Sequence, residues 1–278
     1  MNTTALPAAG AILALLPQLL VPTPARAANY AAQVVQFHPG TGATPGYDHT
    51  DALLGEPSRV TPGEFGGPVD PFSSPWQSGQ LLSLGAGGSV TLRFDHPVLD
   101  QPGNPFGLDF LVFSSAAFLI VNGDFSGGGI TDGSLFGAAS GPTRVAVSQD
   151  GLRFFTLDPD LAPTVDGFFP TDGSGDFSRP VDPRLDAADF AGLGLEGIRG
   201  LYAGSGGGTG YDLDWARNAD GQPVALDSIL FVRIDVISDR AEIDAVSAVP
   251  EPSSFALLLA GGFLLRLRTS RSRRMAAR

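Results

Sequence analysis

The chain has 278 residues, 43% of them hydrophobic, with 37 Gly, 23 Pro, no Cys and a net charge of −12. Without cysteine it has no disulfides, no thiol catalysis and no cysteine metal sites. Residues 28–249 alone carry 10 Arg, no Lys and 28 acidic residues, which leaves a net charge of −18. A body this acidic repels phosphate backbones, so nucleic acid is excluded as an expected partner.

The N-terminal sequence has the pattern of an export signal. Residues 5–21 are apolar apart from Gln18, and a small-residue motif follows at Ala25-Arg26-Ala27. Such a stretch is typical of a signal peptide cleaved after Ala27, and it is too short and too interrupted to make a good membrane span. We therefore expect a removable signal over residues 1–27. The alternative is an Ala/Pro-rich leader on a cytosolic protein.

Residues 28–248 predict one all-β domain, a sandwich or barrel. Short apolar runs alternate there with Gly- and Pro-rich turn clusters, and helical periodicity is nearly absent. The clearest strand spans 89–94, where Val90, Leu92 and Phe94 share one face. In chain order, the expected strands are 32–37, 80–84, 89–94, 108–113, 143–148, 152–157, 230–236 and 241–246.

Two further local features shape the expected topology. Asp150-Gly151 between apolar runs predicts a tight hairpin turn. Near the end, Leu230, Val232, Ile234 and Val236 are expected on one face of a strand. Long polar loops are expected at 38–79, 122–142, 158–197 and 203–224, with a short helix at 183–190; loops of this length are usually functional or mobile.

A series of short motifs follows in order along the body: Leu54-Gly55-Glu56-Pro57, residues 83–94, Leu108-Asp109-Phe110-Leu111-Val112-Phe113, residues 145–151, Tyr211-Asp212-Leu213-Asp214-Trp215-Ala216, residues 231–236 and Glu242-Ile243-Asp244-Ala245-Val246. In these motifs the body resembles a family of bacterial cell-surface proteins with a galactose-binding-like, discoidin-type jelly roll. The resemblance covers most of residues 52–246 and implies that fold more firmly than any ligand.

Enzymatic chemistry finds little support, and we predict a protein that is not an enzyme. The chain has 3 His and no Gly-x-Ser-x-Gly elbow between a strand and a helix, which argues against a Ser-His-Asp triad. No pair of carboxylates is marked out for glycoside hydrolysis. The glycine run 204–210 has no Lys and no strand-helix setting, so it predicts a flexible loop and not a phosphate site.

Calcium is the candidate cofactor. The resemblance favours a structural calcium, and Asp109, Asp212, Asp214 and Asp244 lie in its strand-like motifs. Calcium takes six to eight oxygen ligands, which several Asp and backbone carbonyls can supply. A second, weaker candidate is residues 172–176. The alternative is that these Asp residues only cap turns.

A glycan is the candidate ligand of the body. Sugars stack their C–H faces on exposed aromatic rings, and Trp76 lies in a Pro/Ser-rich loop suited to that role. Trp215 follows Asp214 directly and is a candidate for the core. Packing in the protein interior remains the alternative for each of the two tryptophans.

A second targeting signal is predicted near the C-terminus, at residues 249–274. A Pro-Glu-Pro motif, an apolar run and an arginine cluster follow one another, which is a stop-transfer order. This tail resembles the PEP-CTERM sorting signal, which implies processing by an exosortase-type membrane enzyme. The residues are Pro250, Glu251 and Pro252 for the motif; Phe255, Leu257, Leu258, Leu259, Phe263, Leu264 and Leu265 for the membrane segment; and Arg266, Arg268, Arg271, Arg273 and Arg274 for stop-transfer.

Together these patterns predict an exported protein that is transiently anchored in the inner membrane and then resides at the cell surface or in the extracellular matrix. The expected role is adhesion or carbohydrate binding, with exopolysaccharide or another glycan as partner. The alternatives are a carbohydrate-active hydrolase and a purely structural matrix component.

Overall fold

A computed structural model of the chain describes residues 29–137 and 141–250. Strands account for most of the regular structure in these ranges and helices are short, so the expectation of a mostly β protein is confirmed. Several predicted features lie outside the described residues: the signal peptide, Glu251 and Pro252 of the sorting motif, the membrane segment from Phe255 to Leu265, and the arginines from Arg266 to Arg274.

The larger sheet has six antiparallel strands in the order β1-β5-β13-β9-β10-β12. Its central strands, β5 and β13, pair over most of their length, from Leu99 opposite Ser228 to Ser89 opposite Asp235. The strands are β1 Ala31–His38, β5 Ser89–Leu99, β13 Ser228–Val236, β9 Thr143–Ser148, β10 Phe155–Leu157 and β12 Ala216–Arg217.

The smaller sheet has four antiparallel strands in the order β11-β6-β14-β4. Strand β6 is buried along its whole length, as its near-continuous apolar sequence leads one to expect. The strands are β11 Thr209–Tyr211, β6 Phe110–Ser114, β14 Arg240–Ala248 and β4 Leu82–Gly85.

The principal core lies between these two sheets. Val90, Leu92 and Phe94 of β5 are all buried there, as their alternation predicts, and they share one hydrophobic cluster with Phe110 of β6 and Ile243 of β14. Phe110 also stacks on Tyr211 of β11, with ring centroids 5.1 Å apart. Burial of the inward faces of both sheets is what holds the two layers together.

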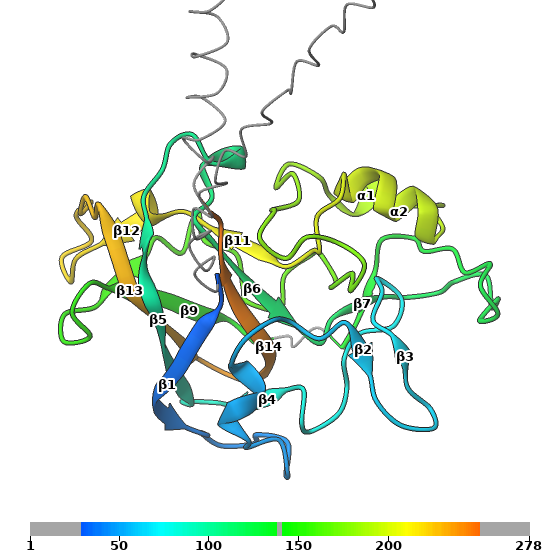
Figure 1. The fold of residues 1–278 in the computed structure, drawn as a ribbon, viewed down its shortest axis with the longest axis horizontal. Helices are drawn as coiled ribbons and strands as arrows, with labels where there is room; N and C mark the ends of the chain where they lie inside the picture. The colour runs from blue at the N-terminus through cyan, green and yellow to red at the C-terminus, as the bar shows by residue number, and fades with distance from the viewer. Residues whose placement is uncertain (1–28, 138–140, 251–278) are drawn as a thin grey trace, which may run out of the picture.

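A second, smaller core lies outside the sheets. Helices α1 (Ala187–Phe190) and α2 (Leu195–Tyr202) lie together on the side of the molecule that carries β7 (Figure 1). Phe190, Ile198 and Tyr202 of the helices pack against Phe118 of β7. Two short hairpins complete the strands: β2 Val60–Thr61 with β3 Gly67–Pro68, and β7 Ala117–Phe118 with β8 Leu135–Phe136. The 3₁₀ helices are Thr50–Leu53, Pro105–Gly107 and Leu213–Trp215.

Two local expectations need correction. A register shift between Ile229 and Phe231 turns Ile229 into the core and leaves Leu230 only half-buried, so Leu230 does not share the face of Val232. The β9–β10 hairpin exists, but β10 begins only at Phe155, because the Asp150 carboxylate accepts the N–H groups of Leu152 and Arg153 and widens the turn.

Helix α2 was not expected at all. Its sequence contains Gly197 and Gly200, which lower helix propensity, and its N-cap Gly194 offers no side-chain hydrogen bond. Ile198 and Tyr202, four residues apart, face the second core together and are buried. Packing therefore forms this helix against its own local preference.

Candidate functional site

An open cleft of about 350 Å³ contains Trp76, the predicted sugar platform. Trp76 lies in the loop before β4, and its side chain is 48% exposed. The Tyr47 hydroxyl donates a 2.6 Å hydrogen bond to the Trp76 carbonyl, and the exposed Phe136 of β8 lines the same cleft. Three aromatic side chains from distant parts of the sequence thus line one cleft.

Polar groups from the start of β14 line the same cleft. Glu242 accepts hydrogen bonds from the Thr44 hydroxyl at 2.8 Å and from the Ser115 hydroxyl at 3.2 Å. Arg240 Nε lies 3.9 Å from Glu242 Oε1, and Asp239, the residue before Arg240, also lines the cleft. Donors and acceptors fixed beside aromatic rings are what small polar ligands require of a binding cleft.

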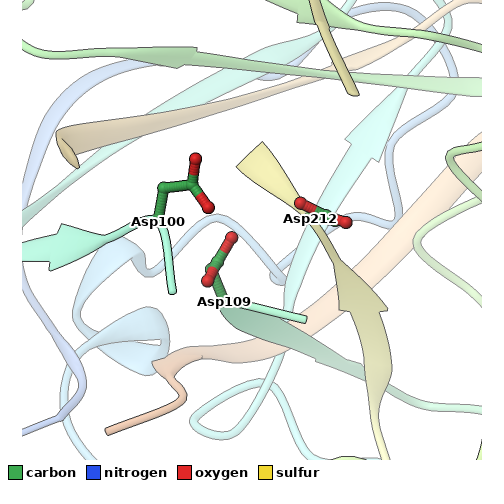
Figure 2. A group of neighbouring side chains, drawn as sticks. All are labelled: Asp100, Asp109 and Asp212. Atoms are coloured by element: carbon green, nitrogen blue, oxygen red, sulfur yellow. The ribbon is translucent and has the colours of Figure 1, made fainter. Parts of the chain in front are cut away.

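A group of three carboxylates forms a second site, where strands of both sheets begin or end. Asp100 follows the last residue of β5, Asp109 precedes β6, and Asp212 follows β11. Because Tyr211 pairs with Phe110, the antiparallel register of β11 and β6 places Asp212 beside Asp109. The three carboxylates point toward one another, with one oxygen of each within 4.8 Å of the others (Figure 2).

The electrostatics of this group favour a positive ligand. The pKa of Asp109 is raised to about 6, chiefly by burial and to a lesser degree by the nearby Asp212 and Asp100, while hydrogen bonds from the N–H groups of Leu213 and Gln101 oppose the rise. Burial, followed by neighbouring carboxylates, also raises the pKa of Asp100 and of Asp212. A cation among them would replace repulsion by attraction.

Asn104 borders this site through its amide group. It is 5% exposed, and its Nδ2 donates to Asp109 Oδ1 at 3.0 Å. Its Oδ1 is buried without a hydrogen-bond partner among the described residues. An unsatisfied buried oxygen is costly unless something compensates it, and a bound cation would do so.

The structure separates the four predicted calcium ligands. Asp109 and Asp212 come together, whereas Asp214 is exposed and its N–H donates to Asp212 Oδ1 at 2.8 Å. Asp244 lies on β14 with both oxygens bound to Ser58, at 2.7 Å to the N–H and 2.9 Å to the hydroxyl. Asp244 is not among the carboxylates that converge at this site, and its predicted role as a ligand beside Asp109 is not supported.

Two other sequence motifs have structural roles. Asp172 makes a 2.8 Å ion pair with Arg199 of α2 and also accepts from the Ser174 hydroxyl, which accounts for its carboxylate without a metal. The expectation of a flexible loop at 204–210 is wrong: Gly206 and Gly208 are buried and approach the rings of Phe177 and Phe113 too closely to admit a Cβ. Trp215 is half-buried against the principal core, as considered from the sequence.

Of the sorting motif, only Pro250 lies within the described residues, directly after Val249. Among residues 29–137 and 141–250, no helix combines the length and apolar character needed to cross a membrane.

Comparison with known proteins assigns no family to this chain. No known protein family matches the chain, and no curated protein resembles it significantly. Among solved structures, a pectin-binding carbohydrate-binding module aligns with 80% of this chain and 94% of its own, at 12% identity and a TM-score of 0.27. A TM-score this low assigns neither fold nor ligand to this chain.

The sequence analysis missed several residues of these sites. Asp100 directly follows β5, but the strand expected from the sequence ended at residue 94, so its place at a strand end became visible only in the structure. Asn104 and Phe136 carry no local sequence signal. They reach their sites through a loop and a two-residue strand whose positions depend on tertiary contacts.

Proposed function

We propose that this chain is an exported surface protein that binds glycans in the Trp76 cleft. The observation that carries the proposal is the convergence of the half-exposed Trp76 ring with Tyr47 and Phe136, beside the hydrogen-bonding side chains of Glu242 and Arg240. Rings recognise the apolar face of a sugar, and fixed polar groups read its hydroxyls. The finer fold in this proposal is a galactose-binding-like jelly roll.

The charge of the cleft selects the class of glycan. Asp239 and Glu242 outnumber Arg240 at its rim, and residues 28–249 carry a net charge of −18. Polysaccharides rich in uronic acids are repelled by such a surface. The proposed ligands are therefore neutral polysaccharides.

Replacement of Trp76 tests this proposal. We expect wild-type protein to bind neutral glucan, galactan, mannan or xylan on a glycan array and to ignore polygalacturonate. Trp76→Ala should weaken the strongest neutral interaction roughly tenfold or more, as removal of an aromatic anchor usually does. Phe65→Ala is the matched control, because Phe65 is 84% exposed and does not line the Trp76 cleft.

Three results would count against glycan binding at this cleft. They are equal binding by wild type and Trp76→Ala, a preference for polygalacturonate, and no binding to any array glycan. The last would favour a purely structural matrix component. Turnover of a bound polysaccharide that disappears with Glu242→Gln would instead establish the hydrolase alternative.

A second candidate function is calcium binding by Asp100, Asp109 and Asp212. The observation that favours it is the buried Asn104 Oδ1, which has no hydrogen-bond partner among the described residues, next to three converging carboxylates. Three carboxylates, this amide oxygen and water would satisfy the coordination that calcium prefers. The site would stabilise the loop between β5 and β6.

Melting temperatures in calcium, magnesium and chelator test the cation site. At calcium near one hundred times its dissociation constant, wild type should gain about 3 kcal/mol, or roughly 5–10 °C. Asp212→Asn keeps an acceptor for the Asp214 N–H but removes a ligand charge, so it should lose most of this gain. Asp220→Asn, at an exposed turn, is the control. Equal responses of wild type and Asp212→Asn would remove the site.

Export and sorting complete the proposal. The signal over residues 1–27, the tail from Pro250 onward and processing by an exosortase-type enzyme rest on the sequence patterns alone. Intact-mass measurement of surface-extracted protein tests them: loss of Arg278 is expected, and its retention would count against processing.

A further inference from the structure

A second cleft lies at the opposite end of β14 from the Trp76 cleft. Arg240, the first residue of β14, lines the Trp76 cleft, and Val249, which follows its last residue, lines the second one. Nine residues of strand at about 3.4 Å each separate the two ends by about 30 Å. The second cleft has a volume of about 490 Å³, within the range of ligand pockets.

The two clefts share their chemistry. The second one, which we call the Phe106 cleft, presents Phe106, 48% exposed, beside Arg179, Asp176 and Asp182. An exposed ring, one arginine and two carboxylates are also what Trp76, Arg240, Asp239 and Glu242 provide at the other end. Similar groups in two clefts indicate ligands of one class.

Phe106 is held in a backbone conformation that its side chain disfavours. Its φ is +60°, in the left-handed region where bulky side chains are genuine outliers. The other non-glycine residues with positive φ among the described residues have ordinary reasons: Ala203 ends α2, and Asp239 lies in a turn, where Asp is tolerated. Strain at Phe106 has no such explanation, and strain of this kind concentrates at binding sites.

The loop around Phe106 is built to maintain this conformation. Asp109 accepts hydrogen bonds from the Gln101 N–H at 3.1 Å and from Asn104 at 3.0 Å, and the Gly107 N–H donates to the Asn104 carbonyl at 3.0 Å. These bonds fix the loop on both sides of Phe106, so its ring stays at the cleft while half of it faces solvent.

We propose that the Phe106 cleft is a second glycan-binding site, with Phe106 as the stacking surface and Arg179 as a hydrogen-bond donor. Asp182 borders the site, but both of its carboxylate oxygens are bound to Arg184. The class of ligand, a neutral polysaccharide, rests on the function proposed for the Trp76 cleft. Two sites about 30 Å apart make the protein bivalent, so one molecule holds two glycan chains or two segments of one chain. Such a protein cross-links polysaccharide.

Phe106→Gly tests the site with opposite signs for stability and binding. Glycine is at ease at positive φ, so the variant should melt at or above the wild-type temperature while losing the ring. Titration calorimetry with the neutral oligosaccharide selected on the array should show two sites in wild type and one in Phe106→Gly, with roughly tenfold or greater weakening at the lost site. Phe125→Ala, which removes a 79% exposed ring outside both clefts, is the control.

Combination with Trp76→Ala separates the two proposals. Both proposals are supported if each single variant keeps one binding site and the double variant binds no oligosaccharide. All three variants should then also lose polysaccharide cross-linking. Unchanged binding in Phe106→Gly together with none in Trp76→Ala overturns the second site and leaves the first. Unchanged binding in Trp76→Ala together with none in Phe106→Gly does the reverse. No oligosaccharide binding by wild type overturns both.

Discussion

Asp109, directly before β6, and Asp244, on the neighbouring strand β14, are both buried, but the charges around them differ. Asp244 is 2% exposed and accepts two hydrogen bonds from Ser58. Asp109 is also inaccessible, yet Asp100 and Asp212 bring two more carboxylates to it. Both aspartates are hydrogen-bonded within the protein, Asp109 by the N–H groups of Gln101 and Leu213 and by the Asn104 amide, but Asp109 sits in a group with an excess of negative charge.

Backbone geometry produces the difference. Asp244 lies where the β14–β6 register shifts, between Ile243 and Ala245, and Ser58 from the loop after the first 3₁₀ helix supplies its donors. Asp109 lies at a strand end, where loops from both sheets meet. Identical residue types in similar motifs thus serve packing at one position and provide a candidate binding site at the other.

The largest effect expected of a single substitution is the loss of stability when Asp244 is truncated. Asp244→Ala leaves the N–H and hydroxyl of Ser58 without their acceptor in a buried setting, which should cost about 2–4 kcal/mol in the free energy of unfolding. Asp95→Ala, at an exposed position, should stay within about 0.5 kcal/mol. Urea denaturation measures both. A cost at Asp244 no larger than at Asp95 would remove the distinction drawn above.

Stability should also depend on pH. Burial raises the pKa of Asp244 to about 7 and that of Asp109 to about 6, from 3.8. Since the folded protein then binds protons more tightly than the unfolded chain, stability is highest below about pH 4 for these two groups and falls as pH rises to about 7. The slope is at most about 1.4 kcal/mol per pH unit for each group.

Calcium makes this pH measurement specific to one aspartate. Asp244→Asn should remove its share of the slope in calcium and in chelator alike. The share of Asp109 should shrink in calcium, because a bound cation stabilises the ionised carboxylate. Denaturation curves from pH 4 to 8 for wild type and Asp244→Asn decide the matter. A slope that calcium leaves untouched would contradict cation binding at Asp109.

The sequence by itself determined the mostly β architecture and the positions of most strands. Alternation in β5, the continuous apolar run of β6 and the apolar strand β9 depend only on local patterning, because a strand exposes its faces with period two. The negative charge and the choice of Trp76 as an exposed ring follow from the sequence in the same way. Half of the predicted metal set, Asp109 and Asp212, also came together.

Only the tertiary structure decided which residues share a site. Helix α2 forms because Ile198 and Tyr202 pack in the second core, although its glycines lower its helix propensity. Asp244 and Ser58 are 186 residues apart in the sequence, and only the fold brings them into contact. The pairing of β11 with β6, and of β14 with both β4 and β6, sets which loops meet at the carboxylate group and at the two clefts. Local sequence patterns contain no information about such long-range register, because its energy comes from burial shared among distant segments.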